Sequence, residues 1–297
     1  MSCRTLFENG RARLGELSCP AESSAWGQLN EIGELAHVAF PRTSAIIHQT
    51  GRDPVVANPN HVLFYNPHQE YRRALVDPRG YSCLFVGVMP DLLAELSAPA
   101  RRSKRLPLAE ARSDRRTSLL LHLLVAAAAR SPRTDPLLVE ELLYGLLAHV
   151  VAAALVRSHA AGDARKPRTR GAHRVLVDEA KCLLSTRMDE RLSLDELARA
   201  LYISPFHLAR VFRAETGSSI HGYRMELRAH VAFQRLSDRR GTLSELAHDV
   251  GYSSSSHFSD SFRGVFGVRP SAVGRMLEAV GASEVRTILE AEVGAQT

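Results

Sequence analysis

The sequence is poor in the residues on which metal sites, disulfide scaffolds and many redox enzymes depend. It holds only four cysteines in 297 residues, Cys3, Cys19, Cys83 and Cys182, and no two of them form a C-x-x-C pair. Neither a zinc knuckle nor a disulfide framework is therefore expected. Buried or incidental thiols are favoured over a redox sensor.

Long apolar runs and catalytic signatures are also missing. No run of 18 apolar residues exists, and the N-terminus lacks the charged start and apolar core of a signal peptide, so we expect a cytoplasmic protein without a membrane span. The sequence has no G-x-S-x-G elbow, no P-loop and no G-x-G-x-x-G turn. We expect no enzymatic activity and no cofactor.

Lysine is scarce as well, because only three of the 38 basic residues are lysine. The planar fork of arginine suits forked recognition of phosphate or guanine. The formal net charge of +6 is modest, and its excess lies in residues 157–171, which carry five basic residues and one acidic residue. Charge alone is weak support for nucleic-acid binding, which usually needs a clear basic face.

Two segments of the C-terminal half, residues 194–217 and 243–267, repeat one pattern. The matching pairs His207/His257, Phe212/Phe262, Arg213/Arg263 and Gly217/Gly267 are each 50 positions apart, whereas Leu197/Leu246 and Ala198/Ala247 are 49 apart. One residue has therefore been inserted in the second turn.

Each unit is typical of two short helices joined by a tight turn. In the first unit, Ser204 offers an N-cap oxygen, Pro205 fits the first helical position and Gly217 suits a left-handed cap. This is the helix-turn-helix pattern, in which the second helix enters the major groove of DNA. Two more helices are predicted over residues 174–187 and 219–236, and the latter is expected to be a rigid rod between the two units.

Residues 172–278 resemble the double helix-turn-helix domain of the AraC/XylS family of bacterial transcription regulators. The late signature of that family is matched here by Gly251-Tyr252, the serines from Ser253 to Ser256, His257-Phe258, Phe262-Arg263, Phe266-Gly267 and Pro270. The resemblance implies double-stranded promoter or operator DNA and RNA polymerase as partners.

The N-terminal half changes its pattern at about residue 108. Short runs rich in β-formers, His37–Phe40, Ser44–His48, His61–Tyr65 and Tyr81–Val88, alternate with Pro-rich turns and predict a small barrel or sandwich. Residues 108–157 then show helical periodicity with two leucine stripes. These stripes are expected either to cover the barrel or to form a dimer seam, with or without barrel packing.

The order of barrel, helix pair, linker and double helix-turn-helix domain again resembles AraC-type regulators, whose N-terminal domain has a cupin-like barrel. We therefore expect an α+β protein with a sensor or dimerisation domain over residues 1–156, a flexible basic linker over 157–171, the DNA-binding domain over 172–278 and a tail over 279–297. A homodimer through residues 108–157 is expected.

By resemblance, base contacts from the first unit fall at Phe206, Ala209 and Arg210. The fork of Arg210 matches the O6 and N7 atoms of guanine. Phe206 is expected either to pack on a thymine methyl group or to serve as a partly buried staple.

In the second unit, the matching base-reading positions are Ser255, Ser256, His257 and Asp260. Family members often carry a basic residue where Asp260 stands, so this helix either reads a different base, such as cytosine through its N4 donor, or contacts DNA weakly. Arg213 and Arg263 lie one turn further along and are expected to bind phosphates. The two readers are therefore expected to prefer different bases.

The resemblance implies a regulator, expected to be an activator, that responds to a small-molecule effector bound in the barrel. Candidates for the pocket are Phe40, Arg42, His48, Phe64, Tyr65 and Tyr71, with Arg42 suited to an anionic ligand or else a surface charge. One alternative is a domain that only dimerises or binds a protein partner.

The second alternative is a metal-dependent cupin enzyme fused to a DNA reader. It would need His48, His61, His68 and Glu70 as ligands, although the sequence has no His-x-His pair. No metal site is expected.

Overall fold

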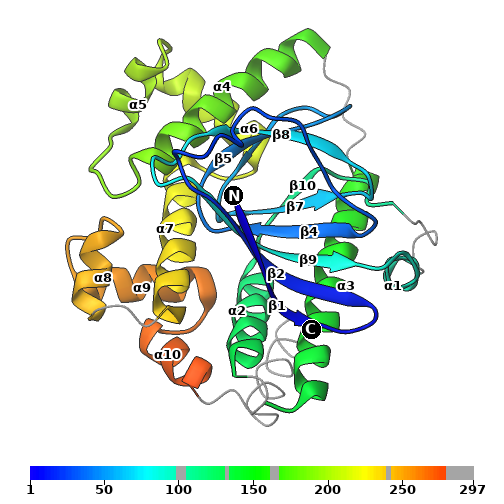
Figure 1. Ribbon diagram of the computed structural model, residues 1–297. Helices are drawn as coiled ribbons and strands as arrows, with labels where there is room; N and C mark the ends of the chain where they lie inside the picture. Colours follow the sequence, from blue (N-terminus) through cyan, green and yellow to red (C-terminus); the bar gives the residue numbers. More distant parts are fainter. Residues whose placement is uncertain (98–104, 131–133, 161–166, 239–241, 279–297) are drawn as a thin grey trace.

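The computed structural model describes residues 1–97, 105–130, 134–160, 167–238 and 242–278 (Figure 1). The N-terminal part consists of two antiparallel sheets, and the C-terminal part is all helical. The predicted α+β class is therefore confirmed.

The two sheets face each other. The larger one has the strand order β1 (Ser2–Glu8), β2 (Ala12–Cys19), β9 (Tyr81–Val88), β4 (Ala36–Pro41), β7 (His61–Tyr65) and β10 (Glu110–Arg112). The smaller one has the order β3 (Asn30–Glu31), β8 (Glu70–Leu75), β5 (Ala45–Gln49) and β6 (Val55–Ala57). Because side chains alternate along each strand, one side of each sheet fills a shared apolar interior. The four predicted β runs coincide with β4, β5, β7 and β9.

The other side of the larger sheet packs against helices. These are α1 (Pro90–Leu96), α2 (Arg115–Ala129) and α3 (Pro136–Ala160), and their apolar residues share a core with Val38, Phe64 and Val86. Over Pro136–Val156, α3 is long and apolar enough to cross a membrane by length and composition. Here Leu142 and Leu146 of α3 are fully buried in the core of the chain itself.

This packing decides between the two roles predicted for the leucine stripes. The stripe residues of α2 and α3, apart from the half-buried Leu155, are at most 5% exposed, so they cannot also line a seam between two chains. The apolar residues of α3 that remain exposed are few, with Leu137 at 69% and Val156 at 71%. Any dimer contact through residues 108–157 must therefore use that outer face.

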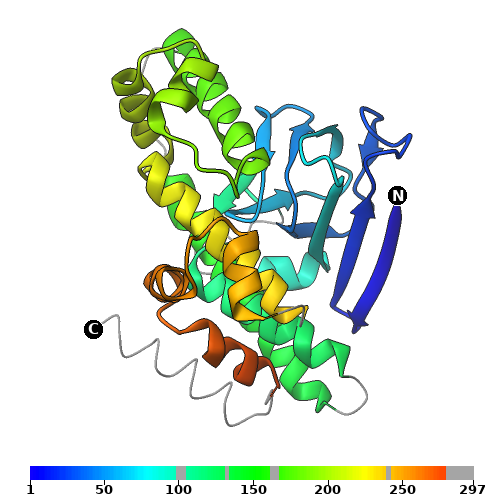
Figure 2. The ribbon, with the colours of Figure 1, turned by 90° about the vertical axis from the view of Figure 1, so that its left-hand side faces the viewer.

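The C-terminal part contains seven helices among the described residues. They are α4 (Pro167–Thr186), α5 (Leu194–Ala200), α6 (Pro205–Thr216), α7 (Ile220–Ser237), α8 (Leu243–Asp249), α9 (Ser255–Phe266) and α10 (Pro270–Glu278). Figure 1 shows α7 running from the first unit, α5 and α6, to the second, α8 and α9. In Figure 2 the helical part lies along one side of the β domain.

The predicted tether over residues 157–171 is shorter than expected. Helix α3 continues to Ala160, and α4 already begins at Pro167. Proline here starts a helix instead of breaking one, because its missing N–H is not needed in the first turn. Residues 161–166 lie outside the described residues.

The caps of the two units confirm the inserted residue and locate it. Capping boxes begin at Ser193 and Thr242, 49 positions apart, whereas the recognition-helix N-caps Ser204 and Ser254 are 50 apart. The turn residues with positive φ are Tyr202 and Gly251, again 49 apart. The extra residue therefore lies between Gly251 and Ser254.

Candidate nucleic-acid interface

Buried aromatic and aliphatic side chains fix the inner face of each recognition helix. On α6 these are Leu208, Val211 and Phe212, and on α9 they are Phe258, Phe262 and Phe266, all at most 1% exposed. Each helix begins with a serine side chain that accepts a backbone N–H and ends at a glycine in the left-handed conformation. The opposite face of each helix is therefore turned to solvent in a fixed orientation.

The outer face of α6 presents most of the residues predicted to read bases. Phe206 is 79% exposed, which excludes the buried staple, and Arg210 and Arg213 are exposed too. Ala209 is half-buried and lines a small cavity with Leu197 of α5. The first unit thus offers an aromatic ring and two guanidinium groups along one helix.

The outer face of α9 has a different chemistry. Ser256, His257, Asp260 and Arg263 are exposed, whereas Ser255 is half-buried in the first turn. The ring of His257 contacts the buried Tyr252 ring edge-on, with centroids 5.3 Å apart. One carboxylate and one guanidinium replace the two guanidinium groups of α6.

Two buried arginines on α7 fasten that helix to the first unit, and the sequence did not reveal their role. Arg224 donates to the carbonyl oxygens of Leu192, Met188 and Glu190, and Arg228 donates to those of Met188 and Glu190. Burial lowers the pKa of Arg228 to about 10. These carbonyls belong to the loop between α4 and α5, so α7 is clamped to the first unit.

A second set of polar contacts docks α7 on the N-terminal domain. Asn58 donates to the Tyr223 hydroxyl over 2.8 Å, and Asn60 donates to the Tyr223 carbonyl oxygen over 3.0 Å. Arg112 forms an ion pair with Glu226. The sequence showed Asn58 only as part of a turn, because its partner lies 165 residues away.

The four aromatic residues predicted for the effector pocket lie on two sides of the larger sheet. Phe40 and Phe64 pack against the helices, whereas Tyr65 and Tyr71 lie between the sheets with ring centroids 5.1 Å apart. Adjacent residues of a strand point to opposite faces, so Phe64 and Tyr65 cannot line the same pocket. Only the two tyrosines are brought together.

The two polar members of that predicted set also lie apart. His48 is exposed on the outer face of β5. Arg42 forms ion pairs with Glu16 at 3.3 Å and Asp238 at 2.7 Å, which ties the β domain to the end of α7. With two carboxylates beside it, Arg42 acts as a structural ion-pair partner.

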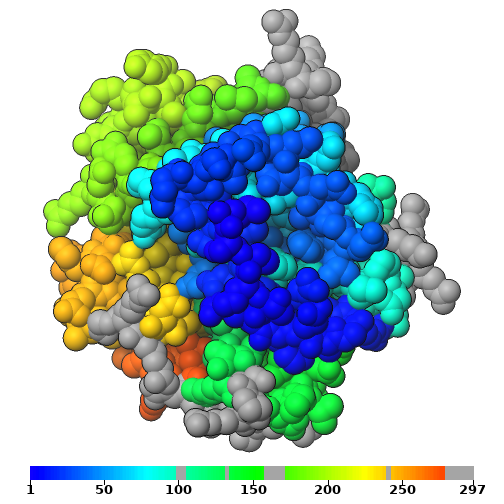
Figure 3. Space-filling view, in the orientation of Figure 1, coloured from blue at the N-terminus to red at the C-terminus, as the bar shows by residue number. Residues whose placement is uncertain are grey.

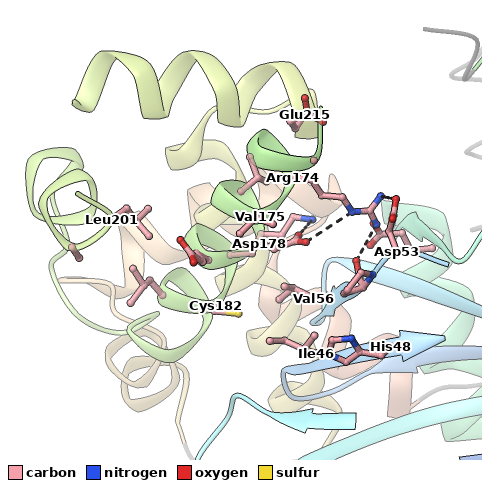
Figure 4. A pocket seen from close by; sticks show the side chains of 18 of the residues that line it. Ile46, His48, Asp53, Val56, Arg174, Val175, Asp178, Cys182, Leu201 and Glu215 are labelled. Atoms are coloured by element: carbon pink, nitrogen blue, oxygen red, sulfur yellow. Dashed lines mark hydrogen bonds and ion pairs between the residues drawn. The ribbon is translucent and has the colours of Figure 1, made fainter. Parts of the chain in front are cut away.

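The cavity in Figure 4 lies between the outer face of β5 and β6 and helix α4, and its volume is about 1260 Å³. Arg174 crosses it to Asp53 at 3.0 Å, and Lys181 lies 3.5 Å from Asp178. Burial raises the pKa of Asp178 and raises that of the Cys182 thiol to about 11. Cys182 therefore stays protonated, which disfavours a redox role.

The possible metal ligands are also dispersed. His61 is buried beside Asn58, His68 pairs with Glu31 at 2.9 Å, and His48 faces the cavity of Figure 4. Across the ranges that the structure describes, no group of three or more histidine, cysteine, aspartate or glutamate side chains could hold a metal ion. The metal-enzyme alternative has no site in this part of the chain.

Comparison with known families covers both halves of the chain. Residues 197–276 match the family model of a helix-turn-helix domain, and residues 45–147 match that of the AraC-like ligand binding domain. The chain belongs to the AraC/XylS family. These matches agree with the family predicted from the late helix-turn-helix signature.

The first curated relatives match about a third of this chain. The HTH-type transcriptional regulator ArgR of Pseudomonas aeruginosa is 31% identical over 94 residues, which are 32% of this chain and 29% of the relative. The chain spans less than two fifths of the length of the first curated relatives it matches.

Two solved structures are also similar. The DNA-binding domain of AdpA, solved in complex with a target DNA, is 24% identical with a TM-score of 0.34, and the match covers 35% of this chain and 93% of that solved domain. ToxT of Vibrio cholerae is 10% identical with a TM-score of 0.35, and the match covers 91% of this chain and 98% of ToxT.

Proposed function

We propose that this AraC-family protein is a sequence-specific DNA-binding transcription regulator that responds to a small-molecule effector bound by its N-terminal domain. The observation that carries the proposal is the pair of solvent-facing recognition helices, α6 and α9, joined by the single helix α7. Figure 3 shows yellow-green and orange atoms of the C-terminal helical part at the surface, on one side of the blue β domain. In helix-turn-helix proteins such helices enter the major groove, and successive grooves on one face lie about 34 Å apart.

Each recognition helix has its own role in the proposal. Phe206, Ala209 and Arg210 of α6 read bases, and Ser255, Ser256, His257 and Asp260 of α9 read a second half-site. Arg213 and Arg263 hold phosphates, which position the protein without reading sequence. Because Arg210 corresponds to Asp260, we expect an asymmetric pair of half-sites.

Selection of bound sequences from a random DNA pool tests this proposal. We expect a motif with one conserved G·C pair that disappears in Arg210→Ala, which should lose roughly 1–3 kcal/mol on the best site and keep its non-specific affinity. Arg199→Ala, an exposed arginine on α5, is the control and should keep the motif. A motif that survives Arg210→Ala would remove Arg210 from the reading set.

Salt titration separates the proposed phosphate contacts from base contacts. Arg213→Ala and Arg263→Ala should each weaken binding to all sequences alike and reduce the slope of log K against log salt by about one unit, because one fewer counterion is released. Binding is measured by fluorescence anisotropy over a range of salt concentrations. An unchanged slope in either variant would show that its arginine does not contact phosphate.

The proposal extends to the setting in which the protein works. We propose a cytoplasmic homodimer that activates transcription by contacting RNA polymerase, with the exposed outer face of α3, from Leu137 to Val156, as the dimer surface. The boundary between its two functional domains lies within residues 157–171. Sedimentation of the chain with Val156→Glu, expected to be monomeric, would check the dimer surface.

A further inference from the structure

The interior between the two sheets holds an arginine without an anionic partner. Arg73 lies on β8, where Tyr71 and Arg73 point inward and Arg72 points outward. Its side chain is among the largest that are fully buried, and the residue is 1% exposed. The ion pairs of the described residues include none to Arg73.

The contacts that Arg73 does make are weak. Its Nη2 atom donates to the thioether sulfur of Met1 at 2.7 Å and lies 3.4 Å from the Oδ1 atom of Asn30, and its buried Nε atom has no hydrogen-bond partner. A thioether is a poor acceptor, and an uncharged amide does not neutralise a guanidinium group. Buried charges in proteins are normally paired, so this site lacks an anion.

Aromatic side chains surround Arg73. The guanidinium carbon lies 5.5 Å from the centre of the Tyr71 ring, and Tyr65 and Tyr81 line the same interior. The Tyr81 hydroxyl is buried beside the Cys83 thiol and has no oxygen or nitrogen partner among the described residues. Burial raises the pKa values of both Tyr65 and Tyr81, so their hydroxyls stay protonated and can donate hydrogen bonds.

Arg73 contacts a residue that is itself exposed to solvent. Met1, which contacts the guanidinium group, is itself 60% exposed. A ligand carboxylate would have to take the place of the Met1 sulfur to meet the guanidinium group. The exchange would also replace a weak hydrogen bond by a charge-assisted one.

We propose that the interior between the two sheets binds a small organic carboxylate with an aromatic or apolar body, anchored by Arg73. That this site is the effector site rests on the proposed function. Binding of the carboxylate itself does not depend on DNA. Arg73 takes the place that the sequence assigned to Arg42, whose charge is already neutralised by Glu16 and Asp238.

Thermal unfolding of the full chain with benzoate and hexanoate as carboxylate probes, and benzamide as the uncharged counterpart of benzoate, tests the site. At least one carboxylate should raise Tm in a saturable way, whereas benzamide should not, because only binding to the folded state raises Tm. Arg73→Met should weaken this binding by at least about tenfold, since it removes the charge-assisted pair. Arg72→Met, on the same strand with its side chain outside, should bind as the wild type does.

The ligand-free variants separate a binding role from a structural one. Arg73→Met should unfold at the same Tm as the wild type or higher, because an uncompensated buried charge has been replaced by an apolar chain. A Tm well below the wild type, or failure to fold, would assign Arg73 a structural role and overturn the proposal. Arg73→Lys keeps the charge without the fork and should show intermediate affinity.

Two further outcomes would also overturn the proposal: no saturable shift with either carboxylate, or equal affinity in Arg73→Met and the wild type. DNA binding is measured in parallel on a selected site. If the chain binds carboxylate through Arg73 but binds no DNA, the proposed function is wrong and this inference still holds. If the chain binds DNA but shows no such carboxylate binding, only this inference is wrong.

Discussion

Replacing Gly251 by alanine is expected to lower the free energy of unfolding of the C-terminal domain by about 2–4 kcal/mol. Gly251 has φ of +82°, and a Cβ atom there would lie 2.4 Å from the Nη2 atom of Arg228 and 2.7 Å from the carbonyl oxygen of Asp189. The Arg228 side chain cannot move freely, since the residue is 7% exposed and donates hydrogen bonds to the carbonyl oxygens of Met188 and Glu190, and the Asp189 oxygen belongs to the backbone. Steric overlap therefore adds to the backbone strain.

The matched control is Gly217→Ala at the end of α6. Gly217 has φ of +73°, but nothing lies within 4 Å of a Cβ atom built there. Only the backbone strain should remain, which amounts to about 1–2 kcal/mol. Urea unfolding followed by circular dichroism compares the two variants. Equal losses at Gly251 and Gly217 would mean that Arg228 and Asp189 give way.

The two turns show what local sequence can and cannot reveal. Gly251-Tyr252 was recognisable as a turn, yet the equivalent turn of the first unit uses Tyr202 at φ of +55°. Tyr202 is 94% exposed, so its side chain meets no obstacle. At Gly251 the side chain is excluded by Arg228, which comes from a different helix. The position of the turn can be predicted from the local sequence. The need for glycine at position 251 depends on a tertiary contact.

Elements with strong local signals were predictable, because such signals do not depend on residues far away in the sequence. Capping serines, Pro205 and the terminal glycines mark helices α6 and α9, and runs of β-branched residues mark the buried strands. Strands β1 and β2, over Ser2–Cys19, were missed. Every residue of β1 is exposed or half-buried at the edge of the sheet, so β1 has no regular apolar alternation.

The candidate sites were harder to predict, because they depend on strand register. Arg72 and Arg73 are identical neighbours in the sequence, and a shift of one residue would exchange their faces. Only the pairing of β8 with β5, which sets His48 opposite Arg72 and Ile47 opposite Arg73, puts Arg73 inside. The leucine stripes of α2 and α3 were ambiguous likewise, since periodicity identifies an apolar face but not the surface that covers it.

Acidification from pH 7 to 5 is expected to destabilise the docking of α7 on the N-terminal domain through two buried histidines. Burial lowers the pKa of His122 on α2 to about 4 and that of His230 on α7 to about 3. His122 packs on Phe233 with ring centroids 4.4 Å apart, and His230 lies 3.0 Å from the Ser118 hydroxyl. Both rings are therefore neutral in the folded protein at pH 5.

The sign follows from the unfolded state, where a histidine has a pKa of about 6.5. Below that pH the unfolded chain binds protons that the folded chain excludes, so stability is present above pH 6.5 and is lost as the pH falls toward the folded values. At pH 5 the loss is about 2 kcal/mol for each histidine. The midpoint of urea unfolding at pH 7 and pH 5 measures the total loss, to which His37 and His61 contribute as well, because burial also lowers their pKa values.

Variants at His122 and His248 test whether His122 causes part of this loss of stability. His122→Phe keeps an apolar ring against Phe233 and removes one titrating group, so it should recover about 2 kcal/mol of the loss expected between pH 7 and 5. His248→Gln, an exposed position on α8, should leave the pH dependence as in the wild type. The same dependence in His122→Phe and the wild type would show that His122 accepts a proton without leaving its place, and hence that the contact between α2 and α7 admits water.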